Sequence, residues 1–124
     1  YEYRQLANDD DIRLIVLFPK LDGSQEVRCM LLHFPLASVP LYEAISYAWG
    51  DPSKTQTIIV DGRPYATTTK VLEILRGMAS PESSRLLWID AVCINQDDLD
   101  EKATQIPLMS KIYCRATSTA VWLG

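Results

Sequence analysis

The feature that most constrains this chain is an apolar run, Leu86 to Ile94, that ends abruptly in polar and acidic side chains. Its length and β-branched content are typical of a central strand covered on both faces. Asn95, Gln96 and Asp97 follow at once, before an amphipathic stretch begins. Ligands of open α/β sheets bind just outside the carboxyl ends of parallel strands. The sequence therefore predicts a site immediately after residue 94.

Other segments have the composition of β-strands, because they are rich in β-branched or aromatic residues and are bounded by turn residues. They are residues 12–18, 26–34, 42–49, 57–60, 63–66 and 118–123. Turn residues at 21–24 separate the first two, which we expect to pair antiparallel. Asp61-Gly62 is a strong signal for a two-residue hairpin.

Two helices are expected between these strands. The first covers residues 69–79, with N-caps available from Thr67 to Thr69 and apolar residues at helical spacing. The second covers residues 99–115, where Asp98 and Glu101 have the spacing of a capping box. Pro107 should kink or split this second helix, since it removes one backbone donor.

The order of these elements predicts the fold class. Two strand–helix–strand units occupy the C-terminal two thirds, which implies parallel pairing with right-handed crossovers. The N-terminal strands are expected to add to that core in antiparallel fashion. The expected fold is therefore α/β, with a mixed sheet. The chain is expected to form one domain over residues 1–124, as the N-terminal fragment of a longer protein, since it starts without Met and stops in a strand.

Composition excludes several classes of function. A net charge of −4 and the lack of a basic stripe argue against nucleic-acid binding. The apolar runs are far shorter than a membrane span requires. Three cysteines, Cys29, Cys93 and Cys114, lie in apolar surroundings without CxxC spacing and are expected to be free thiols of a reducing compartment. We expect no metal or cofactor, because one histidine cannot complete a zinc site and the acids match no known loop spacing.

Three groups of residues carry a family resemblance. They are the segment Tyr42-Glu43-Ala44-Ile45-Ser46-Tyr47-Ala48-Trp49-Gly50-Asp51, the segment Leu87-Trp88-Ile89-Asp90-Ala91-Val92-Cys93-Ile94-Asn95-Gln96-Asp97-Asp98, and Glu101 with Gln105, Met109, Ile112-Tyr113, Ala116 and Val121-Trp122-Leu123-Gly124. In this order and spacing the chain resembles the fungal heterokaryon incompatibility (HET) domain over nearly all of residues 10–124.

The resemblance implies a cytoplasmic effector of self/non-self recognition in filamentous fungi, which triggers programmed cell death after incompatible strains fuse. It further implies self-association on activation and a sensor region elsewhere in a larger protein. HET domains have been proposed as distant relatives of TIR domains, many of which cleave NAD. The resemblance thus implies a TIR-like fold, with NAD as a substrate rather than a cofactor.

Glu101 is the candidate catalytic residue that this resemblance implies. A TIR-type reaction needs a carboxylate near the nicotinamide ribose, where positive charge develops as the glycosidic bond breaks. Glu101 follows a central strand and lies in the first helical turn. The alternative is structural, because a Glu at this position completes a capping box and suits the helix dipole.

Further residues are candidates for binding a ligand. The acids at the helix start oppose pyrophosphate and favour a cationic or polyhydroxyl group, or are simply solvated. Asp90, inside an apolar strand, needs a partner, which is either a structural hydrogen-bond donor or a ligand. Trp49 either stacks on a ligand ring or covers the core. The candidates are Ser46, Tyr47, Trp49, Asp90, Asn95, Gln96 and Asp97.

The sequence is compatible with two functions. One is an NAD glycohydrolase that is active when the domain clusters, with Glu101 at its centre. The other is a non-enzymatic death-signalling module that acts by homotypic assembly, with the acidic helix start as its binding surface. Both depend on one geometric expectation, that the turn after residue 94 shares a cavity with the end of the 42–49 segment.

Overall fold

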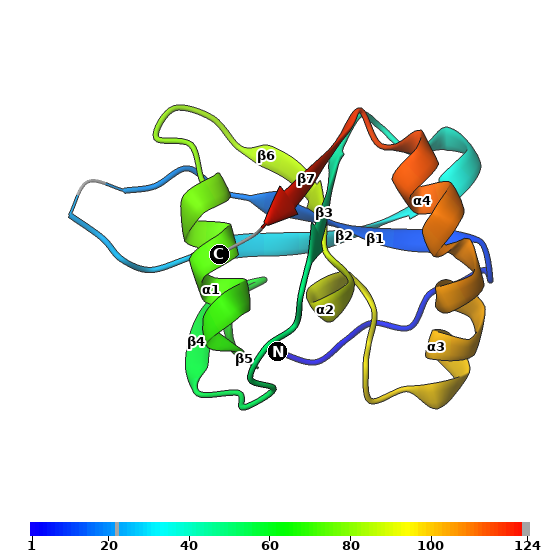
Figure 1. Ribbon diagram of the computed structural model, residues 1–124, viewed down its shortest axis with the longest axis horizontal. Helices are drawn as coiled ribbons and strands as arrows, with labels where there is room; N and C mark the ends of the chain where they lie inside the picture. Colours follow the sequence, from blue (N-terminus) through cyan, green and yellow to red (C-terminus); the bar gives the residue numbers. More distant parts are fainter. Residues whose placement is uncertain (22, 123–124) are drawn as a thin grey trace.

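The computed structural model describes residues 1–21 and 23–122, which form a mixed sheet with helices on both of its faces (Figure 1). The strand order is β5-β4-β2-β1-β6-β3-β7. The strands are β1 (Asp11–Leu17), β2 (Arg28–Pro35), β3 (Glu43–Tyr47), β4 (Gln56–Val60), β5 (Arg63–Thr67), β6 (Arg85–Trp88) and β7 (Ser118–Trp122). The helices are α1 (Thr69–Met78), α2 (Asp90–Cys93), α3 (Leu99–Gln105) and α4 (Met109–Arg115). Short 3₁₀ turns cover Leu36–Ser38 and Ile106–Leu108.

The strand directions confirm a mixed α/β sheet. β3 runs parallel to β6 and to β7, and these strands form the parallel core. β1 pairs antiparallel with β2 on one side and with β6 on the other. The unit from β6 to β7 joins parallel strands, as expected. The unit from β5 to β6 does not, because the register from β5 through β4, β2 and β1 makes β5 and β6 run in opposite directions.

Local sequence signals explain several element boundaries. Asp61 and Gly62 both have positive φ angles, 52° and 77°, as the tight turn of the β4–β5 hairpin requires. The Thr68 hydroxyl accepts the Val71 N–H and begins α1. Pro107 lies in the 3₁₀ turn that separates α3 from α4, which confirms the expected split. Residue 22 of the expected 21–24 turn and residue 123 of the expected last strand lie outside the described residues.

The expectation of one continuous strand over residues 86–94 is wrong. β6 ends at Trp88, and α2 forms a single helical turn closed by the Cys93 N–H donating to the Ile89 carbonyl at 2.8 Å. Asp90 is therefore the first residue of a helix and not an interior strand residue. The apolar run gave a wrong prediction because β6 and α2 are both buried. The periodicity of apolar residues alone cannot separate a short buried helix from a buried strand.

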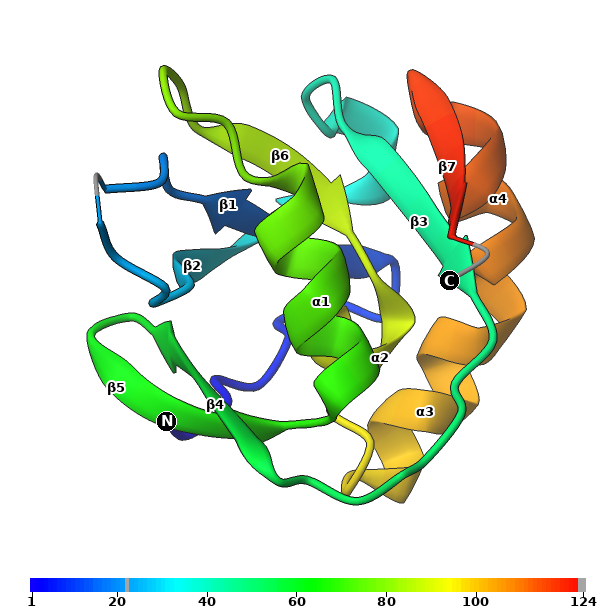
Figure 2. The ribbon, with the colours of Figure 1, turned by 60° about the vertical axis from the view of Figure 1, so that its left-hand side comes forward.

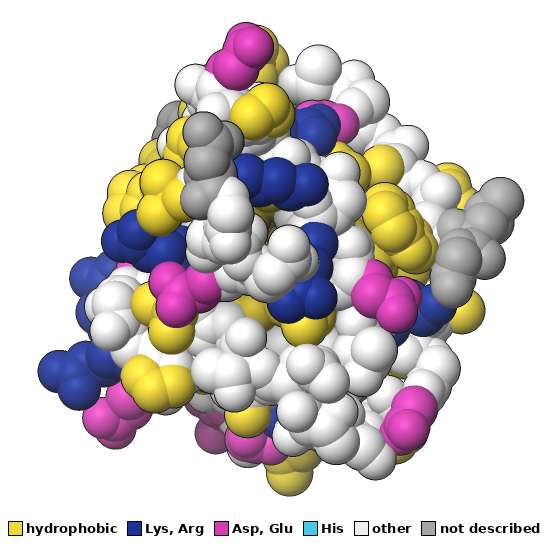
Figure 3. Space-filling view, turned by 90° about the vertical axis from the view of Figure 1, so that its left-hand side faces the viewer, with side chains coloured by type: hydrophobic (Ala, Val, Ile, Leu, Met, Phe, Trp, Pro, Cys, Tyr) yellow, Lys and Arg dark blue, Asp and Glu magenta, His cyan; other side chains and the backbone are white. Residues whose placement is uncertain are grey.

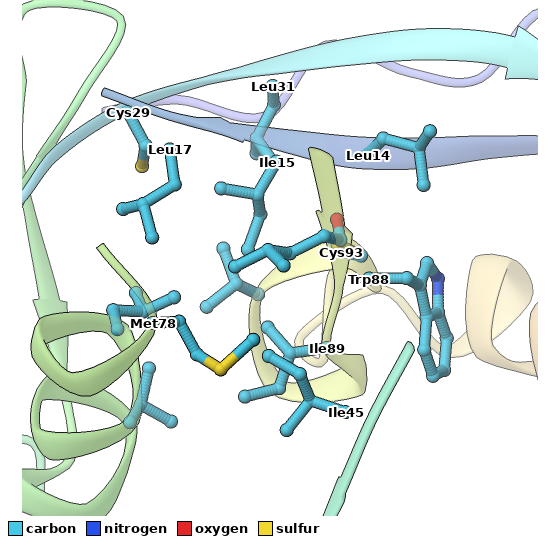
Figure 4. Packing of buried hydrophobic residues seen from close by; sticks show 14 of the residues in the cluster. Leu14, Ile15, Leu17, Cys29, Leu31, Ile45, Met78, Trp88, Ile89 and Cys93 are labelled. Carbon is cyan, nitrogen blue, oxygen red and sulfur yellow. The ribbon is translucent and has the colours of Figure 1, made fainter. Parts of the chain in front are cut away.

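The apolar core covers both faces of the sheet, since the buried cluster includes one face of α1 and also Ile112 of α4 and Trp88. One face of α1 is buried. Met78, at the end of this helix, lies next to Ile45 of β3 and to Ile89, which precedes α2 (Figure 4). Trp88 points to the other face of the sheet, where it packs against Tyr113 of α4. The ring centroids are 5.4 Å apart, and the ring planes are nearly perpendicular, at 81°. Among the described helices, none is long and apolar enough to span a membrane.

Candidate functional site

An aromatic pocket is lined by residues from the end of β3, the junction of β5 with α1 and the loop after α2. Figure 2 shows the backbone of this region, in which α2 lies beside the N-terminal end of α1. The aromatic lining of the pocket consists of Tyr3, Tyr47, Trp49 and Tyr65. Its polar lining includes Thr67, Thr68, Asn95, Gln96 and Asp97. The turn after residue 94 thus opens onto a cavity shared with the end of the 42–49 segment, as the sequence predicts.

Tyr47 and Trp49 form a platform on one side of this pocket. Their ring planes are parallel to within 8°, and their centroids are 6.5 Å apart. Trp49 is 43% exposed, so it is not a core tryptophan. Its indole Nε1 donates to Asp90 Oδ2 at 3.3 Å, which fixes the orientation of the ring. An exposed, oriented indole is a surface on which a planar or cationic ring can stack.

Asp90 lies behind Trp49 and is not part of the pocket lining among the described residues. Burial raises the pKa of this carboxyl above its usual value, and the hydrogen bond from Trp49 opposes that rise. Burial, followed by the nearby charge of Asp90, also raises the pKa of Tyr47. The partner that Asp90 needs is therefore the indole of Trp49, and the contact makes Asp90 a structural support of the platform.

The loop after α2 supplies the polar rim. The Gln96 side-chain amide donates to the Asp90 carbonyl at 2.9 Å, and the Asp97 N–H donates to Asn95 Oδ1 at 3.3 Å. These bonds hold the turn while the same residues line the pocket. Asp97 is exposed, and its carboxylate is the acidic group of the lining.

Ser46 lies outside the described lining of the pocket. It follows Ile45 and precedes Tyr47 in β3, and successive side chains of a strand point to opposite faces. Ser46 is accordingly on the α4 side of the sheet, where its hydroxyl hydrogen-bonds Tyr113. The sequence placed Ser46 in the correct strand but not on the face that borders the pocket.

Glu101 forms a buried ion pair with Arg13. The two guanidinium nitrogens Nη1 and Nη2 donate to Oε2 and Oε1 at 2.7 and 2.6 Å. Oε2 also accepts the Asn95 N–H at 2.6 Å. Both carboxylate oxygens are therefore occupied, and neither Glu101 nor Arg13 is among the described residues that line the aromatic pocket. Asp98 does cap α3 by accepting the Glu101 N–H, but the Glu101 side chain goes to Arg13.

Sequence reasoning missed Arg13, which pairs with Glu101, and several residues of the pocket lining, among them Tyr3, Lys54 and Tyr65. Arg13 lies within β1, is completely buried, and is the one cation in an otherwise apolar run from residue 12 to residue 18. A buried charge must be paired, so its position signals an acidic partner without identifying that partner. Tyr3 and Tyr65 join through their hydroxyls at 2.7 Å, a contact between residues far apart in the chain that carries no local sequence signal.

The size of the pocket limits what it can hold. The cavity volume is about 80 Å³, about half of the roughly 150 Å³ cavity that accommodates a benzene ring. One ring could therefore enter only partly, stacked against Trp49, while the rest of a ligand lies along the surface. A second small pocket lies between residues 18–20, residues 24–28 and α1, and its charged lining residues are Lys20, Glu26, Arg28 and Arg76. Figure 3 shows Lys and Arg side chains, with some Asp and Glu side chains, on the face that carries α1.

Comparison with known proteins places the chain in a family. The family model described as "Heterokaryon incompatibility protein (HET)" matches residues 42–124. The chain is also 36% identical over 140 aligned residues to "Heterokaryon incompatibility protein 6, OR allele" of Neurospora crassa, an alignment that covers 100% of the chain and 21% of that protein. The chain thus spans about a fifth of the length of this curated relative. No solved structure matches the chain with significance. On the family match and this identity, the chain belongs to the heterokaryon incompatibility (HET) family.

Proposed function

We propose that this domain is a cytoplasmic effector of fungal heterokaryon incompatibility, and that it triggers programmed cell death by hydrolysing NAD in the aromatic pocket. Family membership and the name of the Neurospora relative support the role in incompatibility. The observation that carries the choice of substrate is the pocket itself, in which an oriented tryptophan face and a carboxylate border the same cavity.

The chemistry of NAD fits this arrangement. Its nicotinamide ring is planar and cationic, and the exposed face of Trp49 offers stacking and cation–π attraction. Cleavage breaks the C–N bond between ribose and nicotinamide, and a water oxygen bonds to the anomeric carbon. The products are nicotinamide, ADP-ribose and a proton. Positive charge develops on the ribose during this step, and a fixed carboxylate lowers its energy.

Asp97 is the carboxylate best situated for that role, because it lines the pocket and is exposed. Glu101, the candidate that the family resemblance implies, would have to leave Arg13 and the Asn95 N–H before it could contact a ribose. We therefore assign the electrostatic role to Asp97. In this proposal Glu101 does not contact the ligand but positions the pocket loop, because its carboxylate accepts the Asn95 N–H.

The test measures free nicotinamide after NAD is incubated with protein clustered through a fused oligomerisation tag. Clustered wild-type protein is expected to release nicotinamide, whereas Trp49→Ala and Asp97→Asn are expected to lose at least about tenfold in rate, the equivalent of about 1.4 kcal/mol in the barrier. Asp100→Asn is the matched control, because Asp100 is an exposed acid of the same helix start that lies outside the described pocket lining. Intact NAD after incubation with the clustered wild-type protein would refute the enzymatic proposal.

The second candidate function is homotypic assembly without catalysis, and one feature of the sheet favours it. Among the described strands β7 pairs with β3 alone, so its other edge has backbone groups available to a further strand. Val121 on this strand is 65% exposed. Under this proposal a clustered domain recruits further copies and leaves NAD intact, so the same assay separates the two functions.

A further inference from the structure

We propose that the buried Arg13–Glu101 pair is a positioning device for the aromatic pocket, and that it sets the affinity of the pocket for NAD. The inference rests on the proposed function of that pocket. It concerns two residues outside the described lining, both of which connect to segments that form it.

Arg13 holds the N-terminal segment of the pocket wall. Its Nη2 donates to the Arg4 carbonyl at 2.8 Å, and its guanidinium carbon lies 4.9 Å from the centroid of the Tyr3 ring. Tyr3 is a wall of the pocket and donates its hydroxyl to the Val92 carbonyl at 2.7 Å. Arg13 Nη1 donates to the carbonyl of the next residue of α2, Cys93, at 3.2 Å. One guanidinium therefore ties the N-terminal segment to α2.

Glu101 holds a second part of the pocket wall, the loop after α2. Its carboxylate accepts the Asn95 N–H at 2.6 Å, while its own N–H donates to Asp98 Oδ1 at 3.1 Å. The loop from Asn95 to Asp98 is thus attached to Glu101 at both ends, and Asn95, Gln96 and Asp97 between them form the polar rim. Because Arg13 and Glu101 are bonded to each other, the two walls of the pocket are fixed relative to one another.

The bonding pattern indicates positioning rather than stability alone. Two buried charges gain little stability over a well-packed apolar pair of similar volume. What an apolar pair cannot supply is the set of directed bonds to Arg4, Cys93 and Asn95 backbone groups. Those bonds fix backbone segments whose side chains enclose the pocket, so their loss should change ligand binding more than folding.

The test replaces both charges at once, as Arg13→Met with Glu101→Leu, in the complete chain. The matched control is Arg85→Met with Glu43→Leu, which removes the ion pair between β6 and β3, away from the described pocket lining. Each protein is titrated with NAD while its tryptophan fluorescence is recorded, and amide hydrogen exchange is measured without NAD. A milder variant, Arg13→Lys, keeps a cation beside Glu101 but cannot reach the Arg4 and Cys93 carbonyls at the same time.

We expect the Arg13/Glu101 double variant to fold, to bind NAD at least about tenfold more weakly, and to exchange the Asn95 amide faster while the β1 and β6 amides stay protected. Arg13→Lys should lie between it and wild type, and the control pair should match wild type in NAD affinity. Unchanged NAD affinity with an unchanged Asn95 exchange rate would overturn the inference. So would unfolding of both Arg13 variants, since the pair would then be a requirement of the fold.

Failure of the proposed function gives a different result. If wild-type protein binds no NAD, the choice of ligand is wrong, and hydrogen exchange alone decides the positioning role. Faster exchange at Asn95 in the double variant, but not in the control pair, would still support it. Equal exchange in all of these proteins would contradict it.

Discussion

Removing Glu101 should destabilise this domain far more than removing any surface acid. In Glu101→Ala the guanidinium of Arg13, which is completely buried, loses both of its charged contacts and has no access to water. Breaking a buried ion pair by removing one partner costs about 3–5 kcal/mol. Domains of this kind have a total free energy of unfolding of about 5–15 kcal/mol. Glu101→Ala is therefore expected to be close to the limit of folding.

Urea denaturation followed by circular dichroism measures this loss. With a urea dependence of about 1–3 kcal/mol per molar for a small protein, the midpoint should fall by at least about 1 M. The control is Glu43→Ala, whose partner Arg85 is 31% exposed and can be solvated after the change. A partly exposed pair is worth about 0–1 kcal/mol. Adding Arg13→Met to Glu101→Ala should recover part of the loss, because no unpaired charge then remains buried. Equal losses for Glu101→Ala and Glu43→Ala would refute the reasoning.

Further predictions concern packing, thiols and pH. Gly77→Ala would place a Cβ 2.5 Å from Trp122 Cη2, so it should destabilise by about 1–3 kcal/mol. In a Trp122→Ala background the same change should instead stabilise by up to about 1 kcal/mol through helix propensity, as thermal melts can show. Burial raises the pKa of the Cys29 and Cys93 thiols to about 12. A colorimetric thiol reagent at pH 8 should therefore react quickly only with Cys114 in the folded protein; a second fast thiol would contradict this. Because burial raises the pKa of Asp90 above its usual 3.8, ionised Asp90 opposes folding, and Asp90→Asn should raise stability at pH 7. That advantage should vanish below pH 3.8, where the carboxyl is protonated in both states; an advantage independent of pH would refute it.

The parts of the fold that were predictable are those with local chemical signals. The Asp61-Gly62 turn, the Thr68 cap of α1 and the break at Pro107 each depend on conformational limits of one or two residues. The direction of β5 relative to β6 had no such signal. It follows from the whole strand order, in which β4, β2 and β1 lie between them.

The location of the candidate site in the fold was predictable from the sequence, but the contacts between its residues were not. The parallel strands β3 and β6 end at the same edge of the sheet. Trp49 follows β3, and Asn95 follows the single turn α2 that comes after β6, so both residues reach the same cavity. The capping-box spacing correctly predicted that Asp98 caps α3, but it did not predict the partner of the Glu101 side chain. The Glu101 carboxylate accepts charge-assisted hydrogen bonds from Arg13, which are stronger than a bond to a backbone N–H of the helix start. Arg13 and Glu101 are 88 residues apart, a separation over which no local pattern specifies a partner.

The most direct test of the central claim is an NMR titration of isotope-labelled protein with NAD. The pocket predicts that the largest shifts fall on the Trp49 indole N–H and on the backbone amides of Asn95 to Asp97, because all of these residues line the same cavity. Shifts confined to the second pocket, beside Lys20 and Arg76, would contradict it, as would a spectrum unchanged at millimolar NAD.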